Sequence, residues 1–262
     1  MEFSGLLTYE LRDQVAWIGL NRPAKRNAIS DALLAGLEAA VRRAQAEARA
    51  MVIFGHGLCF SAGLDLSEHR SREPAEVFRH SRSWHAAFAV IRHGSIPAIA
   101  ALHGATVGGG LELAAACHLR VADATAFFAL PEGQRGIYVG GGASVHVARL
   151  LGASRVTDMM LTGRVLDAAS AERMGLVNYF VEAGSALAKA GELAAKMTGM
   201  APLTVLGVLS ALPRIQNMTE EDGLFVESMM AALAQTGPEA AARMTDFVEK
   251  RSAKLTRPTE ES

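Results

Sequence analysis

A seven-residue apolar run at positions 96–102 is the feature that most limits how this chain can fold. The run contains no polar side chain, which is typical of a strand that is covered on both faces. A glycine-rich turn follows it and leads into a helical pattern at 111–117. Strands covered on both faces belong to parallel sheets that have helices on either side, so we expect an α/β fold.

Strand and helix patterns alternate through the first part of the chain. Ser30 is expected to cap a helix with an apolar stripe, and a polar stretch at 67–83 is predicted to be a mobile loop that covers a site. Trp84, Phe88 and Ile91 lie at helical spacing after that stretch. A hairpin and further strands are expected at 6–11 with 15–20, 51–54, 118–122, 127–130 and 176–181.

Beyond position 199 the pattern becomes wholly helical. Three amphipathic helices are expected at 203–212, 222–233 and 238–255. We therefore divide the chain into a core at 1–199, which holds the active site, and a C-terminal helical region at 200–262. The second region would pack either on its own core or on a neighbouring subunit.

Charge and apolar patterning exclude several classes of protein. The chain has 26 Lys and Arg against 27 Asp and Glu, whereas a nucleic-acid-binding protein normally has a basic excess. Its apolar run at 96–102 is far shorter than the roughly 18 residues that cross a bilayer. Charged residues interrupt the first twenty positions, and the two cysteines lie far apart. We expect a cytoplasmic protein with no membrane or nucleic-acid partner.

The segment 103–118 is the most informative for chemistry. Glu112 is its only carboxylate, and three consecutive glycines at 108–110 let a backbone approach a ligand closely. Unpaired N–H groups at the start of the following helix favour an anionic oxygen there. The alternative is an ordinary glutamate in the first turn of a helix. The segment lacks the residues of a P-loop and the spacing of a dinucleotide-binding motif.

Glu132 is a second candidate, in a turn after the strand predicted at 127–130. Taken by itself it is more typical of a solvated turn than of a functional site. No Gly-x-Ser-x-Gly motif indicates a serine hydrolase, and no closely spaced histidine pair or His/carboxylate cluster indicates a metal site. Among the histidines, His103 is the one whose position beside the glycine-rich segment merits attention.

Several blocks together resemble the signature segments of the enoyl-CoA hydratase/isomerase (crotonase) family. They cover nearly the whole chain in the right order and lie at 21–28, 60–66, 103–114, 130–136, 161–163 and 175–177. The resemblance implies a crotonase-like spiral of ββα units with a C-terminal helical annex. Within the family, residues 131–142 and 211–213 are most similar to the 3-methylthioacryloyl-CoA hydratases.

The resemblance also implies an active site. Two backbone N–H groups, at Ala62 and Gly109, would form an oxyanion hole for the thioester carbonyl. Glu112 and Glu132 would hold the attacking water, with Glu112 as the base and Glu132 as the acid that protonates Cα. The reaction would be hydration of a short α,β-unsaturated acyl-CoA. No separate cofactor is expected, because coenzyme A is part of the substrate.

Binding of coenzyme A and assembly are implied in the same way. Lys25, Arg26 and Lys250 would bind the phosphates, although surface cations are usually only solvated. The family resemblance also implies a homo-oligomer, a trimer or a hexamer, with the terminal helices at the subunit contact.

Other activities of the same fold stay open at this point. They are a double-bond isomerase, a thioester hydrolase and a non-catalytic acyl-CoA-binding or RNA-binding relative. The presence of both glutamates favours the hydratase. His118 and Arg135 depart from the usual family residues, so the acyl pocket is expected to differ. For Arg135 we favour a structural ion pair over contact with a ligand.

Overall fold

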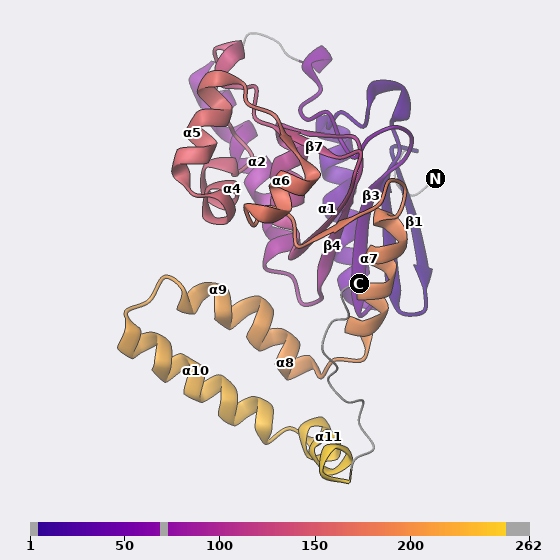
Figure 1. The fold of residues 1–262 in the computed structure, drawn as a ribbon, viewed down its shortest axis with the longest axis vertical. Coiled ribbons are helices and arrows are strands. Elements are labelled where there is room, and N and C mark those ends of the chain that lie inside the picture. The colour runs from indigo at the N-terminus through magenta and orange to yellow at the C-terminus, as the bar shows by residue number, and fades with distance from the viewer. Residues whose placement is uncertain (1–4, 69–72, 250–262) are drawn as a thin grey trace. The chain divides into compact units, whose positions relative to one another are not determined.

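The computed structural model describes residues 5–68 and 73–249 (Figure 1). The strands are β1 (Leu7–Arg12), β2 (Val15–Leu20), β3 (Ala50–Gly55), β4 (Ala98–Leu102), β5 (Ala105–Val107), β6 (Leu119–Asp123), β7 (Phe127–Ala129), β8 (Leu166–Asp167) and β9 (Tyr179–Val181). The helices are α1 (Asp31–Glu47), α2 (Pro74–Arg92), α3 (Gly109–Ala116), α4 (Ala143–Leu151), α5 (Ala153–Thr162), α6 (Ala168–Arg173), α7 (Ala186–Thr198), α8 (Pro202–Leu206), α9 (Leu212–Ile215), α10 (Glu220–Gln235) and α11 (Pro238–Val248).

A six-stranded sheet in the order β1-β2-β3-β4-β6-β9 forms the centre of the first unit. Strands β1 and β2 pair antiparallel, as the predicted hairpin requires, and the other neighbours pair parallel. Every residue of β4 is buried, which confirms the strand expected from the apolar run. Helix α7 covers one face, while α1 and other helices share a hydrophobic cluster with the opposite face (Figure 1). The predicted α/β class is confirmed.

A second sheet of β5, β7 and β8 brings the functional segments together. The loop after β3 runs beside β5, because Ser61 forms an isolated parallel bridge with Thr106. In this bridge the Ser61 N–H donates to the Ala105 carbonyl, and the Val107 N–H donates to the Ser61 carbonyl. This pairing places the 60–66 and 103–114 sequence blocks side by side.

The helix predicted around Trp84 is longer than expected. The polar stretch predicted as a loop is helical from Pro74 onward, within α2. Pro74 occupies the first turn, where its missing N–H has no cost, and the charged side chains lie on an exposed face while Trp84, Phe88 and Ile91 are buried. The prediction of a loop over 67–83 is wrong for residues 74–83, because a high charge density does not prevent an amphipathic helix.

The chain divides into two compact units, Met1–Gly199 and Met200–Ser262. In the second unit, Thr219 caps α10 by accepting a hydrogen bond from the Asp222 N–H, and α8 continues through a π-helical turn at Gly207–Ala211 into α9. Large apolar side chains are exposed along these helices, among them Phe225, Leu233 and Phe247.

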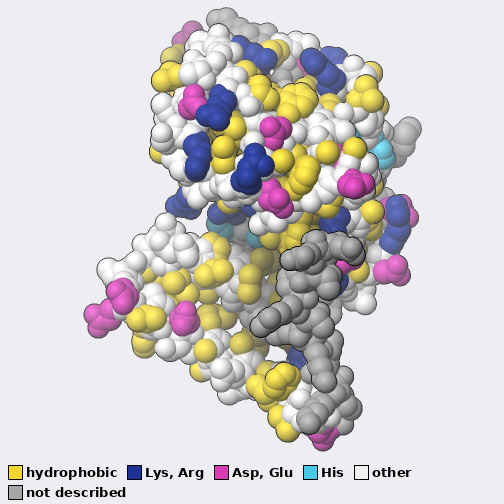
Figure 2. Space-filling model, viewed as in Figure 1, with side chains coloured by type: hydrophobic (Ala, Val, Ile, Leu, Met, Phe, Trp, Pro, Cys, Tyr) yellow, Lys and Arg dark blue, Asp and Glu magenta, His cyan; other side chains and the backbone are white. Residues whose placement is uncertain are grey.

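The face drawn in Figure 2 shows Lys and Arg side chains interspersed with Asp and Glu over the first unit. None of the helices within residues 5–68 and 73–249 combines the length and the apolar character needed to cross a membrane.

Candidate active site

One cavity of about 410 Å³ in the first unit brings most of the predicted site residues together. Ala62, Gly109, Glu112 and Glu132 all line it. The other lining residues come from α1, α2, the loop after β3, and the segment between β7 and α4; they include Asp31, Leu64, Asp65, Val77, His80, Trp84, Arg135, Ile137, Tyr138 and Gly141. Segments spread between Asp31 and Gly141 in the sequence therefore meet at a single cavity.

Glu112 lies in the first turn of α3, as predicted, and is only 3% exposed. Its Oε1 atom accepts hydrogen bonds from the Gly141 N–H at 2.8 Å and the Ala143 N–H at 3.0 Å. Burial raises the pKa of Glu112, and these N–H donors oppose that rise because they stabilise the charged carboxylate. The carboxylate is thus held in one position by two main-chain donors.

Glu132 precedes the short 3₁₀ helix η3 (Gly133–Arg135) and lines the cavity from the segment between β7 and α4. A Cβ atom added at Gly108 would lie 2.6 Å from its Oε1, so this close approach requires glycine at position 108. Its Oε2 is buried and has no hydrogen-bond partner among the described residues. Burial raises the pKa of Glu132 to about 7, and the charge of Glu112 adds to the rise.

Gly109 is the first residue of α3, so its N–H has no partner within the helix. The second donor predicted beside it is not Ala62, because the Ala62 N–H donates to the Arg26 carbonyl at 2.9 Å. The structure therefore contradicts the prediction for Ala62.

Leu64 offers a free N–H instead. Ile29 forms a parallel bridge with Leu64, in which the Ile29 N–H donates to Gly63 and the Asp65 N–H donates to Ile29. The alternation of an extended chain turns the Leu64 N–H away from Ile29, and it has no acceptor among the described residues. A Cβ atom added at Gly109 would lie 3.4 Å from the Leu64 nitrogen, so the two amides are close neighbours.

Trp84 is a part of the site that the sequence placed only in a helical pattern. Its ring is 4% exposed and lines the cavity. A Cβ atom added at Gly109 would lie 2.6 Å from Trp84 Cζ3, and one added at Gly141 would lie 3.0 Å from its Cε3. The ring therefore packs against both the glycine at the start of α3 and the glycine that binds Glu112. Its closeness to two glycine-rich segments was not visible from the helical spacing of Trp84.

The predicted phosphate-binding cations lie beside the cavity rather than in its wall. Lys25 Nζ donates to Ser67 Oγ at 2.8 Å and lies 3.6 Å from Asp65 Oδ2. The Arg26 carbonyl accepts a hydrogen bond from the N–H of Ala62, which lines the cavity, so Arg26 lies next to the cavity wall. Lys250 lies outside the described residues.

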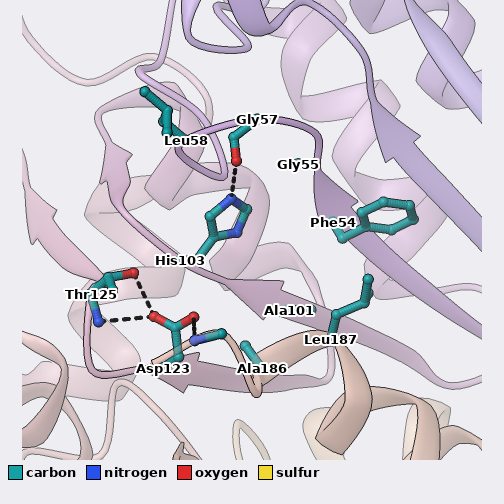
Figure 3. Close-up of a pocket in the computed structure, with 11 residues that line it drawn as sticks. Phe54, Gly55, Gly57, Leu58, Ala101, His103, Asp123, Thr125, Ala186 and Leu187 are labelled. Atoms are coloured by element: carbon teal, nitrogen blue, oxygen red, sulfur yellow. Dashed lines mark hydrogen bonds between the residues drawn. The ribbon is translucent and has the colours of Figure 1, made fainter. Parts of the chain in front are cut away.

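A second cavity, also of about 410 Å³, contains His103 (Figure 3). His103 Nε2 lies 3.0 Å from the Gly57 carbonyl, and His103 is not among the residues that line the cavity of Glu112 and Glu132. The nearby Asp123 is bonded on both oxygens, by Thr125 through Oδ1 and by the Gly184 N–H through Oδ2. His103 and Asp123, the titratable side chains of this second cavity, are therefore both hydrogen-bonded to neighbouring protein groups. Within the part of the chain that the structure describes, no group of three His, Cys, Asp or Glu is placed to hold a metal ion.

Comparison with known proteins identifies the family. The family model described as enoyl-CoA hydratase/isomerase matches residues 10–258, which is almost the entire chain. The chain belongs to the enoyl-CoA hydratase/isomerase family. The family resemblance expected from the sequence is thereby confirmed.

Relatives of this hydratase/isomerase family member extend over most of its length. A protein of Arabidopsis thaliana, named probable enoyl-CoA hydratase 2, mitochondrial, is 36% identical over 237 residues, which are 89% of this chain and 79% of the relative. A solved structure from Rhodopseudomonas palustris, provisionally named an enoyl-CoA hydratase, is 49% identical with a TM-score of 0.92 and covers 95% of this chain and 97% of its own.

A Geobacillus kaustophilus structure titled as an enoyl-CoA hydratase subunit is 28% identical with a TM-score of 0.90, covering 98% of this chain and 99% of its own. These similarities confirm the predicted crotonase-like fold.

Proposed function

We propose that this enzyme, an enoyl-CoA hydratase, adds water across the α,β double bond of a short acyl-CoA thioester. The observation that carries the proposal is the meeting of four groups in one cavity. Two carboxyl groups, from Glu112 and Glu132, share the cavity with the N–H groups of Leu64 and Gly109, which have no acceptor within residues 5–68 and 73–249. Hydration uses all four groups, because it requires an acid, a base and, for the oxyanion, a pair of hydrogen-bond donors.

The two amides are proposed to form the oxyanion hole. Attack of water at Cβ moves negative charge onto the thioester oxygen, which becomes an enolate oxygen. Fixed N–H donors stabilise this charge more strongly in the transition state than in the ground state. The partial positive charge at the start of α3 adds to the effect at Gly109.

Glu112 is proposed to act as the base and Glu132 as the acid. Two main-chain N–H donors favour the ionised form of Glu112, whereas the buried Oε2 of Glu132 has no donor in the described chain and its pKa is about 7. Glu112 would accept a proton from water as the oxygen bonds to Cβ, and Glu132 would give its proton to Cα. Water is thereby added completely, and the two carboxyls have exchanged protonation states.

Details of the substrate and assembly follow from the sequence resemblance. The acyl group is proposed to be short, with 3-methylthioacryloyl-CoA as the specific candidate. Lys25 and Arg26, beside the cavity, are proposed contacts for the coenzyme A phosphates, together with Lys250. A homo-oligomer, trimer or hexamer, is proposed to form through the C-terminal helical region, and the exposed apolar side chains on its helices support this proposal.

The test is turnover of crotonyl-CoA and 3-methylthioacryloyl-CoA by the purified full-length protein, followed by loss of the conjugated enoyl absorbance. We expect hydration of at least crotonyl-CoA, with a 3-hydroxyacyl-CoA as product. A folded protein that hydrates neither thioester would contradict the proposed activity. Faster turnover of crotonyl-CoA than of the methylthio substrate would contradict only the specific candidate.

A further inference from the structure

Arg135 is a charged residue in the cavity wall that the proposed reaction does not use. It ends η3, the same turn that follows Glu132, and its N–H donates to the Glu132 carbonyl at 3.0 Å. Among the described residues, no group accepts a hydrogen bond from its guanidinium or forms an ion pair with it. The structural ion pair that the sequence favoured for Arg135 is therefore not found within the described chain.

The other charged groups in the wall are already satisfied or belong to the reaction. Asp31 pairs with His80 at 2.8 Å, and Asp65 pairs with Arg22 at the same distance. Glu112 and Glu132 are the proposed acid and base. Arg135 is thus the cation in this wall, within the described residues, that has no protein partner.

Arg135 is exposed, and apolar side chains share the cavity wall with it. Ile137 and Tyr138 follow it in the cavity wall, Val77 lines the same cavity from α2, and all three side chains are exposed. A neutral acyl group bound against this wall would displace water from the guanidinium and offer no hydrogen bond in return, which is unfavourable. An acyl group that ends in a carboxylate would supply the missing partner.

The paired glutamates strengthen this argument. The ionised Glu112 makes the cavity negative, so an anionic acyl group would be repelled unless a cation compensates for its charge. The charge of Arg135 already reaches the site, since it lowers the pKa of Glu132 against the larger effect of burial. Arg is also suited to a carboxylate because its planar guanidinium can donate two parallel hydrogen bonds.

We infer that Arg135 determines acyl specificity by binding a carboxylate at the far end of the acyl group. The substrate class is then the mono-CoA thioester of a short α,β-unsaturated dicarboxylic acid. This inference rests on the proposed hydratase reaction and assigns it a different acyl terminus from the thioether of 3-methylthioacryloyl-CoA. The chemistry is otherwise unchanged: water adds across the double bond, and the terminal carboxylate takes no part in bond formation.

The experiment compares kcat/KM for glutaconyl-CoA, crotonyl-CoA and 3-methylthioacryloyl-CoA. Wild-type protein is expected to prefer glutaconyl-CoA. Arg135→Gln should lower the ratio of glutaconyl-CoA to crotonyl-CoA turnover by about tenfold or more, since a charge-assisted pair is lost. Arg135→Lys should keep part of the preference because it retains the charge without the planar geometry. Arg82→Gln is the matched control, because Arg82 is exposed on α2 and is absent from the cavity wall.

The ratio of glutaconyl-CoA to crotonyl-CoA turnover distinguishes binding of the terminal carboxylate from other roles of Arg135. An unchanged ratio in Arg135→Gln would overturn it. Equal increases in KM for all three thioesters would also overturn it, since they would place the guanidinium on the shared coenzyme A portion. Absence of turnover with every thioester by folded wild-type protein would instead contradict the proposed hydratase function.

Discussion

Gly141 donates its backbone N–H to Oε1 of Glu112 across 2.8 Å, from a segment 29 positions further along the chain. The same glycine packs against Trp84, because a Cβ atom there would lie 3.0 Å from the ring. Glu112 is therefore positioned by a backbone donor that has no side chain of its own. The position of the proposed base depends on glycine at 141.

Gly141→Ala is predicted to reduce kcat by about 10²-fold or more. The new Cβ would lie 2.5 Å from Glu112 Oε2, so the carboxyl group must move away from the position in which it would activate water. Gly140→Ala is the control, because its Cβ would meet only Ser81, at 3.7 Å and beyond. If Gly141→Ala and Gly140→Ala have equal kcat values with crotonyl-CoA, catalysis does not depend on the position of the Glu112 carboxyl group.

Gly63→Ala is predicted to damage the oxyanion hole. Its Cβ would lie 2.6 Å from the Val107 carbonyl and 3.1 Å from the Gly109 nitrogen, so the loop that carries the Leu64 amide and the start of α3 must separate. Loss of one such donor typically lowers kcat by about 10²- to 10³-fold. Because Gly63 has a φ of +92°, the control is Gly152→Ala, which has a similar φ of +86° and no atom within 4 Å of the new Cβ. If both variants lose activity equally, backbone strain rather than the donors explains the loss.

The rate of hydration is predicted to fall as the pH rises above about 7. Burial raises the pKa of Glu132 to about 7, so its acidic proton is present below that value and is lost above it. The dependence of log(kcat/KM) on pH should therefore have a descending limb near neutrality. A rate that stays constant to pH 9 would be inconsistent with Glu132 as the proton donor, provided that the protein remains folded.

Glu132→Gln is predicted to stabilise the protein at pH 8. A carboxyl whose pKa is raised by folding binds more protons in the folded state, so the free energy of unfolding decreases as the pH rises from about 4.5 to about 7. The variant lacks this effect and should be more stable at pH 8 by about 1 to 3 kcal/mol, with little difference at pH 4. Urea unfolding at both pH values tests this, with the exposed Glu182→Gln as a control for the charge change. A Glu132→Gln protein less stable than wild type at pH 8 would contradict the prediction.

The sequence was sufficient to predict the parallel sheet and the position of Glu112. A short unbroken apolar run followed by a glycine-rich turn is typical of a strand between two layers, and β4 is buried throughout. Glu112 stood out because it was the single carboxylate beside three glycines. In both cases the decisive information was local.

The donor at Leu64 could not be found in the same way. Every residue of an extended loop has an N–H, and the Ile29 bridge decides which one faces the cavity. That bridge joins segments 35 positions apart, so motif matching chose Ala62 instead. The missed N-terminal half of α2 has a similar cause, because the exposed face of a helix and a solvated loop have the same charged composition.

The most direct test of the account is the turnover of crotonyl-CoA by Glu112→Gln, Glu132→Gln and the double variant. Each single change should lower kcat by about 10²- to 10⁴-fold, because each removes either the base or the acid. The double variant should be little slower than the slower single variant, since the two groups act on one water as a unit. Near-normal kcat in either single variant would contradict the proposed pair.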